Sequence, residues 1–542
     1  MKNHGLKFIV CVILLFFCFG CVNQVKLKAE KQSPRLPSLA NADLNGTLNL
    51  ALGGEVSILN PILSSDSTSS AIEGVIFSGM LRFDKYLQPK PDLAERWTTS
   101  PDGKIWTFYL KKNVFWHDGH AFDAQDVKFT FDAILNPKVN SVRRSDYIID
   151  GVPIKFEVVD QSTLRAILPK PFAPFLPNAA MGILPEHLLA GKDLNRADFN
   201  RNPIGTGPFK LQEWRPGNFV VVERNDQYFG KRPRLKKIIY KIIPDENSRL
   251  VVYAAGEIDA VDIPPKDYGR ALTLPCTNVF EYETLLYTYL GLNLANPIFS
   301  DINVRRALSH AVNKAQLVAL VLKGQGLPAN SPNAPVSWAY SNAVVKYAYD
   351  PAQSRRLLEK SEYKIGTDGY YAKNGKRLEF TVVINQGNKE RQQAAIILQQ
   401  QFKQVGVKMN IQVLEWSALL RIVNAPADPK NFDAVLMGWS LGIDPDSYSL
   451  WHSSQYPRGL NFIKYRNPQA DKLLEAGRTE LSQAKRRAIY AKLYRQITDD
   501  APYIFLWYPT VVSAVSQRVG GIDPNPGPAG VFLDVEDVFV VK

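Results

Sequence analysis

The chain has 542 residues, of which 45% are hydrophobic, enough to build the cores of two or three domains. Its formal net charge is +13, but the 65 Lys and Arg residues are spread along the chain and form no concentrated run on a predicted helix. Composition therefore argues against nucleic-acid binding, and we expect a solvated basic surface.

The first 20 residues have the pattern of a signal peptide. Lys2 and Lys7 precede an apolar run over residues 8–19 that is short for a membrane span. A glycine and then Cys21 follow, and this pair resembles the bacterial lipobox, in which the cysteine is lipidated and becomes the mature N-terminus. Phe19 is bulkier than the residue usual at that position. An ordinary signal peptide, or a retained anchor, therefore remains an alternative.

The cysteines and the next segment fit an exported protein held on a tether. Three of the 4 Cys lie within the first 21 residues, so Cys276 would remain alone and no internal disulfide could form. Residues 22–45 contain prolines and several lysines but no aromatic residue. Such a composition is typical of a flexible linker, with a reach of roughly 27 Å.

Residues 93–137 predict a turn, a strand, a second turn and a helix. The strand has apolar residues at every second position, which predicts one buried face: Trp106, Phe108 and Leu110. Asp123 is suited to cap the helix that follows, and Asn136-Pro137 should end it.

Several segments resemble, in the same order along the chain, the large peptide-binding proteins that feed ABC importers. They are the block 93–137 and residues 46–80, 202–209, 301–308 and 501–507. On these motifs the chain is identified as a member of bacterial extracellular solute-binding protein family 5. The resemblance extends over nearly all of residues 46–542.

The resemblance implies an α/β fold of the periplasmic-binding-protein type II class, a clamshell of two lobes and three domains with mixed sheets and flanking helices. After a signal peptide (1–20) and a lipid-anchored tether (21–45), the chain would pass between its domains several times. The implied segments are domain I at 46–80, 203–292 and 500–542, domain II at 81–202, and domain III at 293–499.

The same resemblance implies a function. The lobes would close around an oligopeptide, bind it mainly through backbone contacts, and deliver it to the permease subunits of an ABC importer. We expect a monomer without a cofactor or enzyme activity. It would be exported and held by the lipid on Cys21 to the outer face of the cytoplasmic membrane, which is the periplasmic side if an outer membrane is present.

Two segments are candidates for strand edges that pair with the ligand backbone. Residues 66–70 are small and polar, and their ligand-binding candidates are Thr68, Ser69 and Ser70. Residues 436–442 follow an alternating apolar pattern, and their candidates are Gly438, Trp439, Ser440 and Leu441.

The sequence departs from related peptide binders at the position of a charged clamp for the ligand. Related peptide binders place an aspartate three residues after the tryptophan, to pair with the peptide ammonium, and here that position is Gly442. Asp444 or Asp446 could take over this role, or the ligand is not held by its N-terminus. Asn461 could line the same cleft.

Two alternatives remain. Residues 438–442 match G-x-S-x-G, so Ser440 could be the nucleophile of a serine hydrolase, although the next residues are a poor helix start and His452 follows closely. The 6 His residues offer no dense cluster for direct metal binding. A metal complexed by a small organic chelator could still occupy the cleft.

Overall fold

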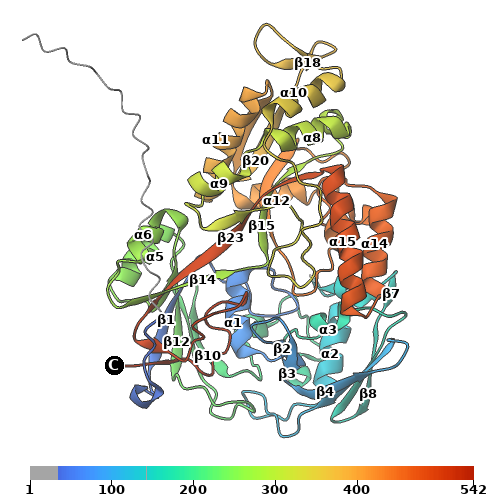
Figure 1. Ribbon diagram of the computed structural model, residues 1–542. Helices are drawn as coiled ribbons and strands as arrows, with labels where there is room; N and C mark the ends of the chain where they lie inside the picture. The colour runs from blue at the N-terminus through green and yellow to red at the C-terminus, as the bar shows by residue number, and fades with distance from the viewer. Residues whose placement is uncertain (1–33, 142) are drawn as a thin grey trace, which may run out of the picture.

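The computed structural model describes residues 34–141 and 143–542 (Figure 1). The predicted signal peptide, the predicted lipidation site Cys21 and residues 22–33 of the predicted tether lie outside these residues. Within the described part, no helix combines the length and apolarity needed to cross a bilayer.

The lower lobe in Figure 1 contains two four-stranded sheets. The first has the order β1 (Thr47–Leu52), β12 (Lys237–Ile242), β11 (Phe219–Arg224) and β10 (Phe209–Arg215). The second is antiparallel, with helix α2 (Ala124–Leu135) packed on it, and its order is β4 (Ala94–Thr99), β5 (Ile105–Leu110), β9 (Thr163–Ile167) and β8 (Lys155–Asp160). Helix α1 (Ser67–Ile76) lies between β1 and the second sheet in sequence and buries Ile72, Val75 and Ile76.

The upper lobe is built on an eight-stranded mixed sheet. Its central order is β13 (Ala260–Asp262), β23 (Tyr503–Ser516), β15 (Leu286–Leu292), β22 (Ala434–Ser440), β20 (Glu379–Asn385) and β21 (Lys408–Leu414), and β14 (Thr277–Glu283) and β16 (Gly326–Pro328) also pair with β23. Its larger helices are α8 (Ile302–Ala311), α9 (Lys314–Leu320), α10 (Pro351–Lys360), α11 (Lys389–Gln404), α12 (Trp416–Val423), α14 (Pro468–Thr479) and α15 (Gln483–Asp500).

Smaller elements complete the described chain. The short strands are β2 (Leu81–Phe83), β3 (Pro89–Pro91), β6 (Ile148–Ile149), β7 (Val152–Pro153), β17 (Lys364–Ile365), β18 (Tyr371–Lys373), β19 (Lys376–Arg377), β24 (Val519–Gly520) and β25 (Phe539–Val540). The remaining helices are α3 (Phe175–Asn178), α4 (Glu186–Leu189), α5 (Glu246–Ala254), α6 (Tyr268–Ala271), α7 (Pro297–Ser300) and α13 (Tyr448–Trp451), with 3-10 turns η1 (Leu39–Asn41), η2 (Arg144–Tyr147), η3 (Asp198–Asn200), η4 (Pro265–Asp267) and η5 (Ser453–Gln455).

Strand β23 joins the two lobes. Its first half pairs with β15 in the upper lobe, and its second half pairs with β13 and β14 toward the lower lobe (Figure 1). The hydrophobic cores follow the same division. One core draws on residues 48–280 and again on 515–540, whereas two others draw on residues 287–508. The chain therefore leaves the lower lobe and returns to it, and the exact domain boundaries remain a prediction.

The predicted block 93–137 is confirmed in detail. In β5 the side chains of Trp106, Phe108 and Leu110 are buried. Asp123 is the N-cap of α2 and forms a capping box with Asp126, which satisfies two backbone donors of the first turn. The Asp126 carboxylate also accepts the indole N–H of Trp116 at 3.1 Å, so it binds the preceding strand region to the helix.

His117, in the turn between β5 and α2, holds the chain where it passes from the second sheet to the first. Its Nδ1 accepts the N–H of Gly205 and its Nε2–H donates to the carbonyl of Gly207, both at 3.1 Å. Acceptance at Nδ1 requires a neutral ring, whereas the Nε2–H bond is compatible with either protonation state. Burial lowers the pKa of His117 to about 4, with Lys210 acting in the same direction and Asp118 against it.

Acid should therefore destabilise the protein through His117. Below pH about 6.5 the unfolded chain takes up a proton that the folded chain accepts only near pH 4, so stability present above pH 6.5 is lost toward pH 4. The contribution is at most about 3 kcal/mol. Urea unfolding of the wild type and of His117→Gln at pH about 7.5 and about 4.5 checks this. We expect the wild type to lose more stability on acidification; equal losses would contradict the assignment.

The predicted tether is too long at its C-terminal end. The backbone N–H of Arg35 donates to Oδ1 of Asn278 at 2.8 Å, and Nδ2 of Asn278 returns a bond to the carbonyl of Arg35 at 3.1 Å. Asp43 pairs with Val540 near the C-terminus. The prediction of a tether as far as residue 45 is therefore wrong, because residues 35–45 are bonded to the folded body.

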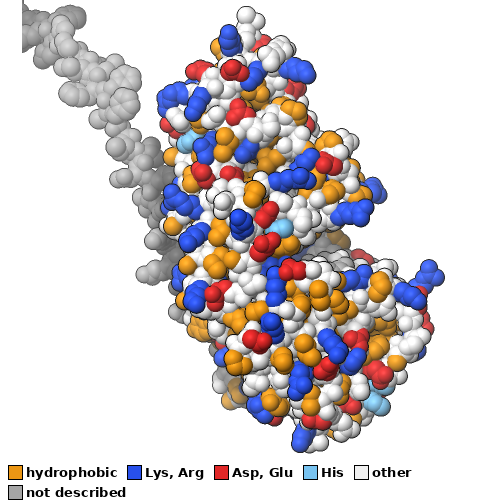
Figure 2. Space-filling view, turned by 90° about the vertical axis from the view of Figure 1, so that its right-hand side faces the viewer, with side chains coloured by type: hydrophobic (Ala, Val, Ile, Leu, Met, Phe, Trp, Pro, Cys, Tyr) orange, Lys and Arg blue, Asp and Glu red, His pale blue; other side chains and the backbone are white. Residues whose placement is uncertain are grey.

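The surface in Figure 2 agrees with the charge pattern of the sequence. On this face Lys and Arg side chains are scattered over both lobes and alternate with acidic ones. They form no continuous basic stripe there. This view gives no sign of an electrostatic surface shaped for nucleic acid.

Candidate functional site

One edge of strand β22 is the clearest candidate for a ligand-binding surface. The N–H of Leu441 donates to the carbonyl of Leu285 at 2.9 Å. In an antiparallel pair the bonded positions alternate, so the backbone groups of Trp439 and Met437 also face β15. Gly438 and Ser440 hold the alternate positions. Their backbone N–H and C=O groups therefore point to the opposite edge of the strand.

That opposite edge is open. Strand β20 pairs with β22 only as far as Val435, and no other strand of residues 34–141 and 143–542 covers the rest. Ser440 is exposed and Gly438 is partly exposed. An extended peptide could add to the sheet here through backbone bonds that do not depend on its side chains.

Trp439 flanks the open edge and is fixed by an aromatic cluster. Its ring lies parallel to Tyr289, with centroids 6.3 Å apart, and its Nε1 is 3.5 Å from the hydroxyl of Tyr503. Tyr289 in turn stacks on Tyr503 at 3.9 Å. The indole is thus held in place while remaining partly exposed, and it could cover an apolar part of a ligand.

Arg391 is a functional candidate that sequence reasoning missed. It lies in the first turn of α11, where its Nη1 donates to Oδ1 of Asn385 at 2.9 Å. Its Nη2 is directed at Gly438, 3.1 Å from where a Cβ would stand. Burial lowers the pKa of Arg391, and the guanidinium forms no ion pair with the described residues. It is available for a ligand carboxylate or carbonyl.

The candidate edge at residues 66–70 is not a strand. Asp66 is the N-cap of α1, and its carboxylate accepts the N–H of Ser69 at 2.8 Å. Thr68 and Ser69 also bond to this carboxylate through their hydroxyls. Ser70 is exposed and remains a contact candidate. The prediction of a strand edge is wrong because the small polar residues cap a helix.

Asp444 and Asp446 do not stand free to clamp an ammonium. Both oxygens of Asp444 accept bonds from Arg486 at 2.6 Å, and the two side chains are 10% and 6% exposed. Asp446 lies 3.0 Å from Nε of Arg478, and burial raises the pKa of its carboxyl. Each carboxylate already has a cationic partner. The structure therefore does not support the prediction that Asp444 or Asp446 binds the peptide ammonium in place of an aspartate at position 442.

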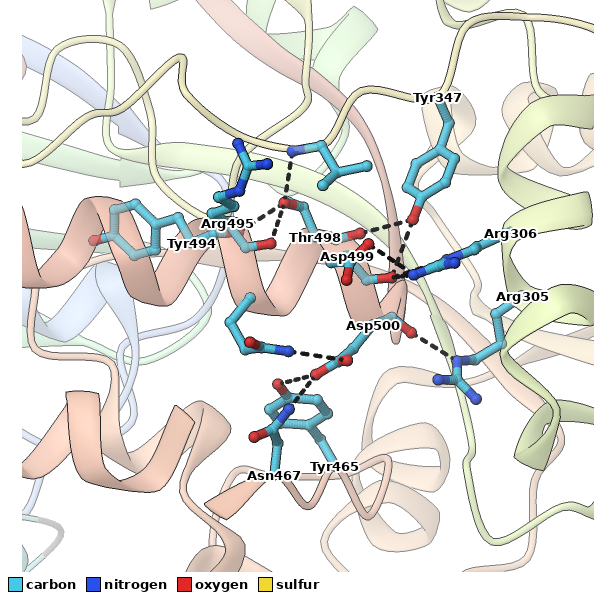
Figure 3. A network of polar contacts seen from close by, with 12 residues as sticks. Arg305, Arg306, Tyr347, Tyr465, Asn467, Tyr494, Arg495, Thr498, Asp499 and Asp500 are labelled. Atoms are coloured by element: carbon cyan, nitrogen blue, oxygen red, sulfur yellow. Dashed lines mark hydrogen bonds and ion pairs between the residues drawn. The ribbon is translucent and has the colours of Figure 1, made fainter. Parts of the chain in front are cut away.

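Asn461 is a structural residue in this fold. It is fully buried, and its amide bonds to the carbonyls of His452 and Tyr465 and to the N–H of Tyr465. Figure 3 shows Tyr465 in turn directed at Asp500, at the end of α15. Its hydroxyl donates to this carboxylate at 2.7 Å, as does Asn467 at 2.6 Å. The prediction that Asn461 lines the cleft is wrong, because it fixes the loop before α14.

Two cavities meet at the loop that follows β22. The first has a volume of about 520 Å³ and lies between residues 145–178 of the lower lobe and residues 442–478 of the upper lobe. The second has a volume of about 450 Å³ and reaches from Ile443 into the lower lobe beside α1. Ile443 lines both cavities, so they form adjacent parts of one space between the lobes.

The comparisons with known proteins agree with this geometry. The model of bacterial extracellular solute-binding proteins, family 5 middle, matches residues 88–459, which is more than half of the chain. The chain belongs to this family. Membership confirms the predicted α/β clamshell fold and the function of binding a solute.

Individual relatives support the same assignment. The chain is 34% identical over 529 residues to the oligopeptide-binding protein AppA of Bacillus subtilis, covering 95% of each chain. The structure of AppA in complex with a nonapeptide matches with a TM-score of 0.83 and 33% identity, over 92% of this chain and 100% of AppA. The structure of NikZ from Campylobacter jejuni in complex with Ni(L-His) matches with a TM-score of 0.82 and 31% identity, over 91% and 99% of the chains.

The G-x-S-x-G match at Ser440 does not form a nucleophile elbow. An elbow requires a helix directly after the strand, but the next helix, α13, begins only at Tyr448. His452 instead directs its Nδ1 to Ser454 at 2.7 Å and its Nε2 toward Glu475 at 3.4 Å. In the described part of the chain, no three His, Cys, Asp or Glu side chains form a group suited to a metal ion.

Arg478 connects the two lobes. Its guanidinium lies 4.6 Å from the ring centroid of Phe172 in the lower lobe and 4.3 Å from that of Tyr448 in the upper lobe. Its carbonyl accepts the N–H of Ala173 at 2.8 Å. These contacts join the lobes at the edge of the cleft, so they should stabilise the arrangement in which the lobes lie together.

Arg478→Lys should weaken ligand binding without unfolding the protein. Lysine keeps a positive charge for Asp446 but loses the planar group stacked between two rings, a change of about 1–2 kcal/mol. We expect calorimetry to show roughly a five- to thirtyfold lower affinity. Small-angle scattering of the free protein should show a larger radius of gyration. An unchanged affinity and radius would mean that Arg478 does not contribute to closure.

Proposed function

We propose that this protein is the extracytoplasmic solute-binding component of an ABC importer, that it binds oligopeptides between its lobes, and that it delivers them to the permease subunits. The observation that carries the proposal is the open edge of β22, where Gly438 and Ser440 offer backbone groups to an extended chain. The AppA relative, whose structure contains a nonapeptide, supports the same ligand class.

The missing clamp favours ligands that are not held by their N-terminus. Gly442 stands where related binders have an aspartate. Asp444 and Asp446 are already paired with Arg486 and Arg478. Backbone pairing along β22, with Trp439 over one face of the ligand and Arg391 beside it, would then supply the affinity. Such a site accepts peptides of several lengths, because neither end needs to reach a fixed charge.

The location of the protein belongs to the same proposal. The family is described as extracellular, and the sequence pattern around Cys21 supports export followed by lipid anchoring on the outer face of the cytoplasmic membrane. We further propose a monomer with the three-domain division given above. Mass spectrometry of the mature N-terminus tests the anchor, since a diacylated cysteine is expected there.

A native mass spectrum of the purified protein tests the ligand class. A heterogeneous set of released peptide masses supports the proposal. A metal isotope signature or a single non-peptide mass would favour a metal chelate, the ligand type in the NikZ structure. If the protein is purified empty, titration with a peptide pool decides: no binding at any length would contradict the proposal.

A further inference from the structure

The cavity of about 450 Å³ beside α1 has an apolar wall and an acidic interior. Its wall includes Phe77, Leu81, Phe83, Met181 and Val535. Four carboxylates line it, against two arginines: Glu73, Asp92, Asp534 and Glu536 against Arg82 and Arg143. A long side chain with an apolar stem and a cationic end would match such a lining.

Glu73 is the group in this cavity that most needs a partner. It is 6% exposed, and its Oε2 accepts the hydroxyl of Ser64 at 2.7 Å. Its Oε1 is buried without a hydrogen bond. A buried oxygen left unpaired costs about 1–3 kcal/mol, more if the group is charged. Burial raises the pKa of Glu73 to about 7, with the Ser64 hydrogen bond and Arg143 acting against the shift and Asp66 in its favour.

Asp92 adds a second buried carboxylate to the same space. It is 8% exposed and forms no ion pair within 4.0 Å among the described residues. Burial raises its pKa to about 7, although Arg82 and Lys111 act against this shift. Arg82 is itself paired with Glu536 at 3.0 Å, and Arg143 is exposed. The buried interior therefore lacks a cation for two carboxylates.

The cavity is placed to receive a side chain from the cleft. Ile443, which follows the open edge of β22, lines it together with Ser70 and Gly74 of α1. We propose that this cavity is a subsite for one lysine or arginine side chain of the bound peptide, with Glu73 as its anionic partner. The inference rests on the proposed peptide-binding function and adds a side-chain preference to it.

A positional peptide scan tests the subsite. Alanine-based nonapeptides carry one lysine at each position in turn, and a matched set carries norleucine, which keeps the stem but lacks the ammonium. At one position or more we expect the lysine peptide to bind wild type at least about tenfold more tightly. Glu73→Gln should remove this preference and leave norleucine binding unchanged.

Two outcomes would overturn the subsite while leaving the proposed function intact: equal binding of lysine and norleucine at every position, or a preference that persists in Glu73→Gln. If no peptide of either set binds, the proposed function fails as well.

A second measurement needs no variant. Calorimetry at pH 7 in two buffers of different ionisation enthalpy should show proton release with the lysine peptide and none with norleucine, because an ammonium beside Glu73 favours its charged form. Equal proton release would contradict the subsite.

Discussion

Ser440→Pro should lower the affinity for oligopeptides by at least about tenfold. Proline lacks the N–H that Ser440 offers at the open edge of β22, and its ring would crowd an added strand. The ladder with β15 loses no bond, because the N–H of Ser440 does not face that strand. The fold should therefore persist, and calorimetric titration with a peptide of about nine residues measures the loss.

Ser440→Ala is the matched control. It keeps the backbone N–H and removes only an exposed hydroxyl, so it should bind like the wild type. If alanine impaired binding as much as proline, the hydroxyl rather than the backbone would be recognised. If proline had no effect while the variant remained folded, the open edge would not be the binding surface.

Asp444→Ala should destabilise the protein by about 3–5 kcal/mol, because it leaves the buried Arg486 guanidinium without its partner. The same loop carries Ile443 and connects β22 to α13, so the ion pair also positions the cleft. Urea unfolding measures the cost. Replacing both partners, Asp444→Leu with Arg486→Met, should recover much of it, since no unpaired charge remains.

This prediction separates a structural role from a ligand clamp. A clamp would lose affinity in Asp444→Asn with little change in stability. The two bonds of 2.6 Å from Arg486 predict instead that this variant loses more stability than affinity. Wild-type stability combined with abolished binding would restore Asp444 as a ligand residue and contradict the ion-pair account.

The sequence predicted best those elements whose signals are local. The alternation at Trp106, Phe108 and Leu110 and the cap at Asp123 depend on near neighbours, and both were correct. Residues 66–70 also carried a local signal that was misread. Asp66 is a favoured N-cap residue, and Ile72, Val75 and Ile76 follow at helical spacing.

The parts that failed depend on distant contacts. Nothing near Asp444 in the sequence indicates that it forms an ion pair with Arg486, and nothing near Asn461 indicates that its side chain is buried. Arg391 and Glu73 read as ordinary charged residues on helices. Only the folded chain places Arg391 against Gly438, and Glu73 inside a cavity with one carboxylate oxygen left without a hydrogen bond.

Hydrogen exchange at single-residue resolution tests the central claim most directly. On adding a saturating oligopeptide, the amides of Gly438 and Ser440 should gain protection, because the ligand backbone would accept their bonds. The amides of Trp439 and Leu441 already bond to β15 and should change little. If the peptide binds and the exchange of Gly438 and Ser440 stays as fast as in the free protein, pairing with the edge of β22 is wrong.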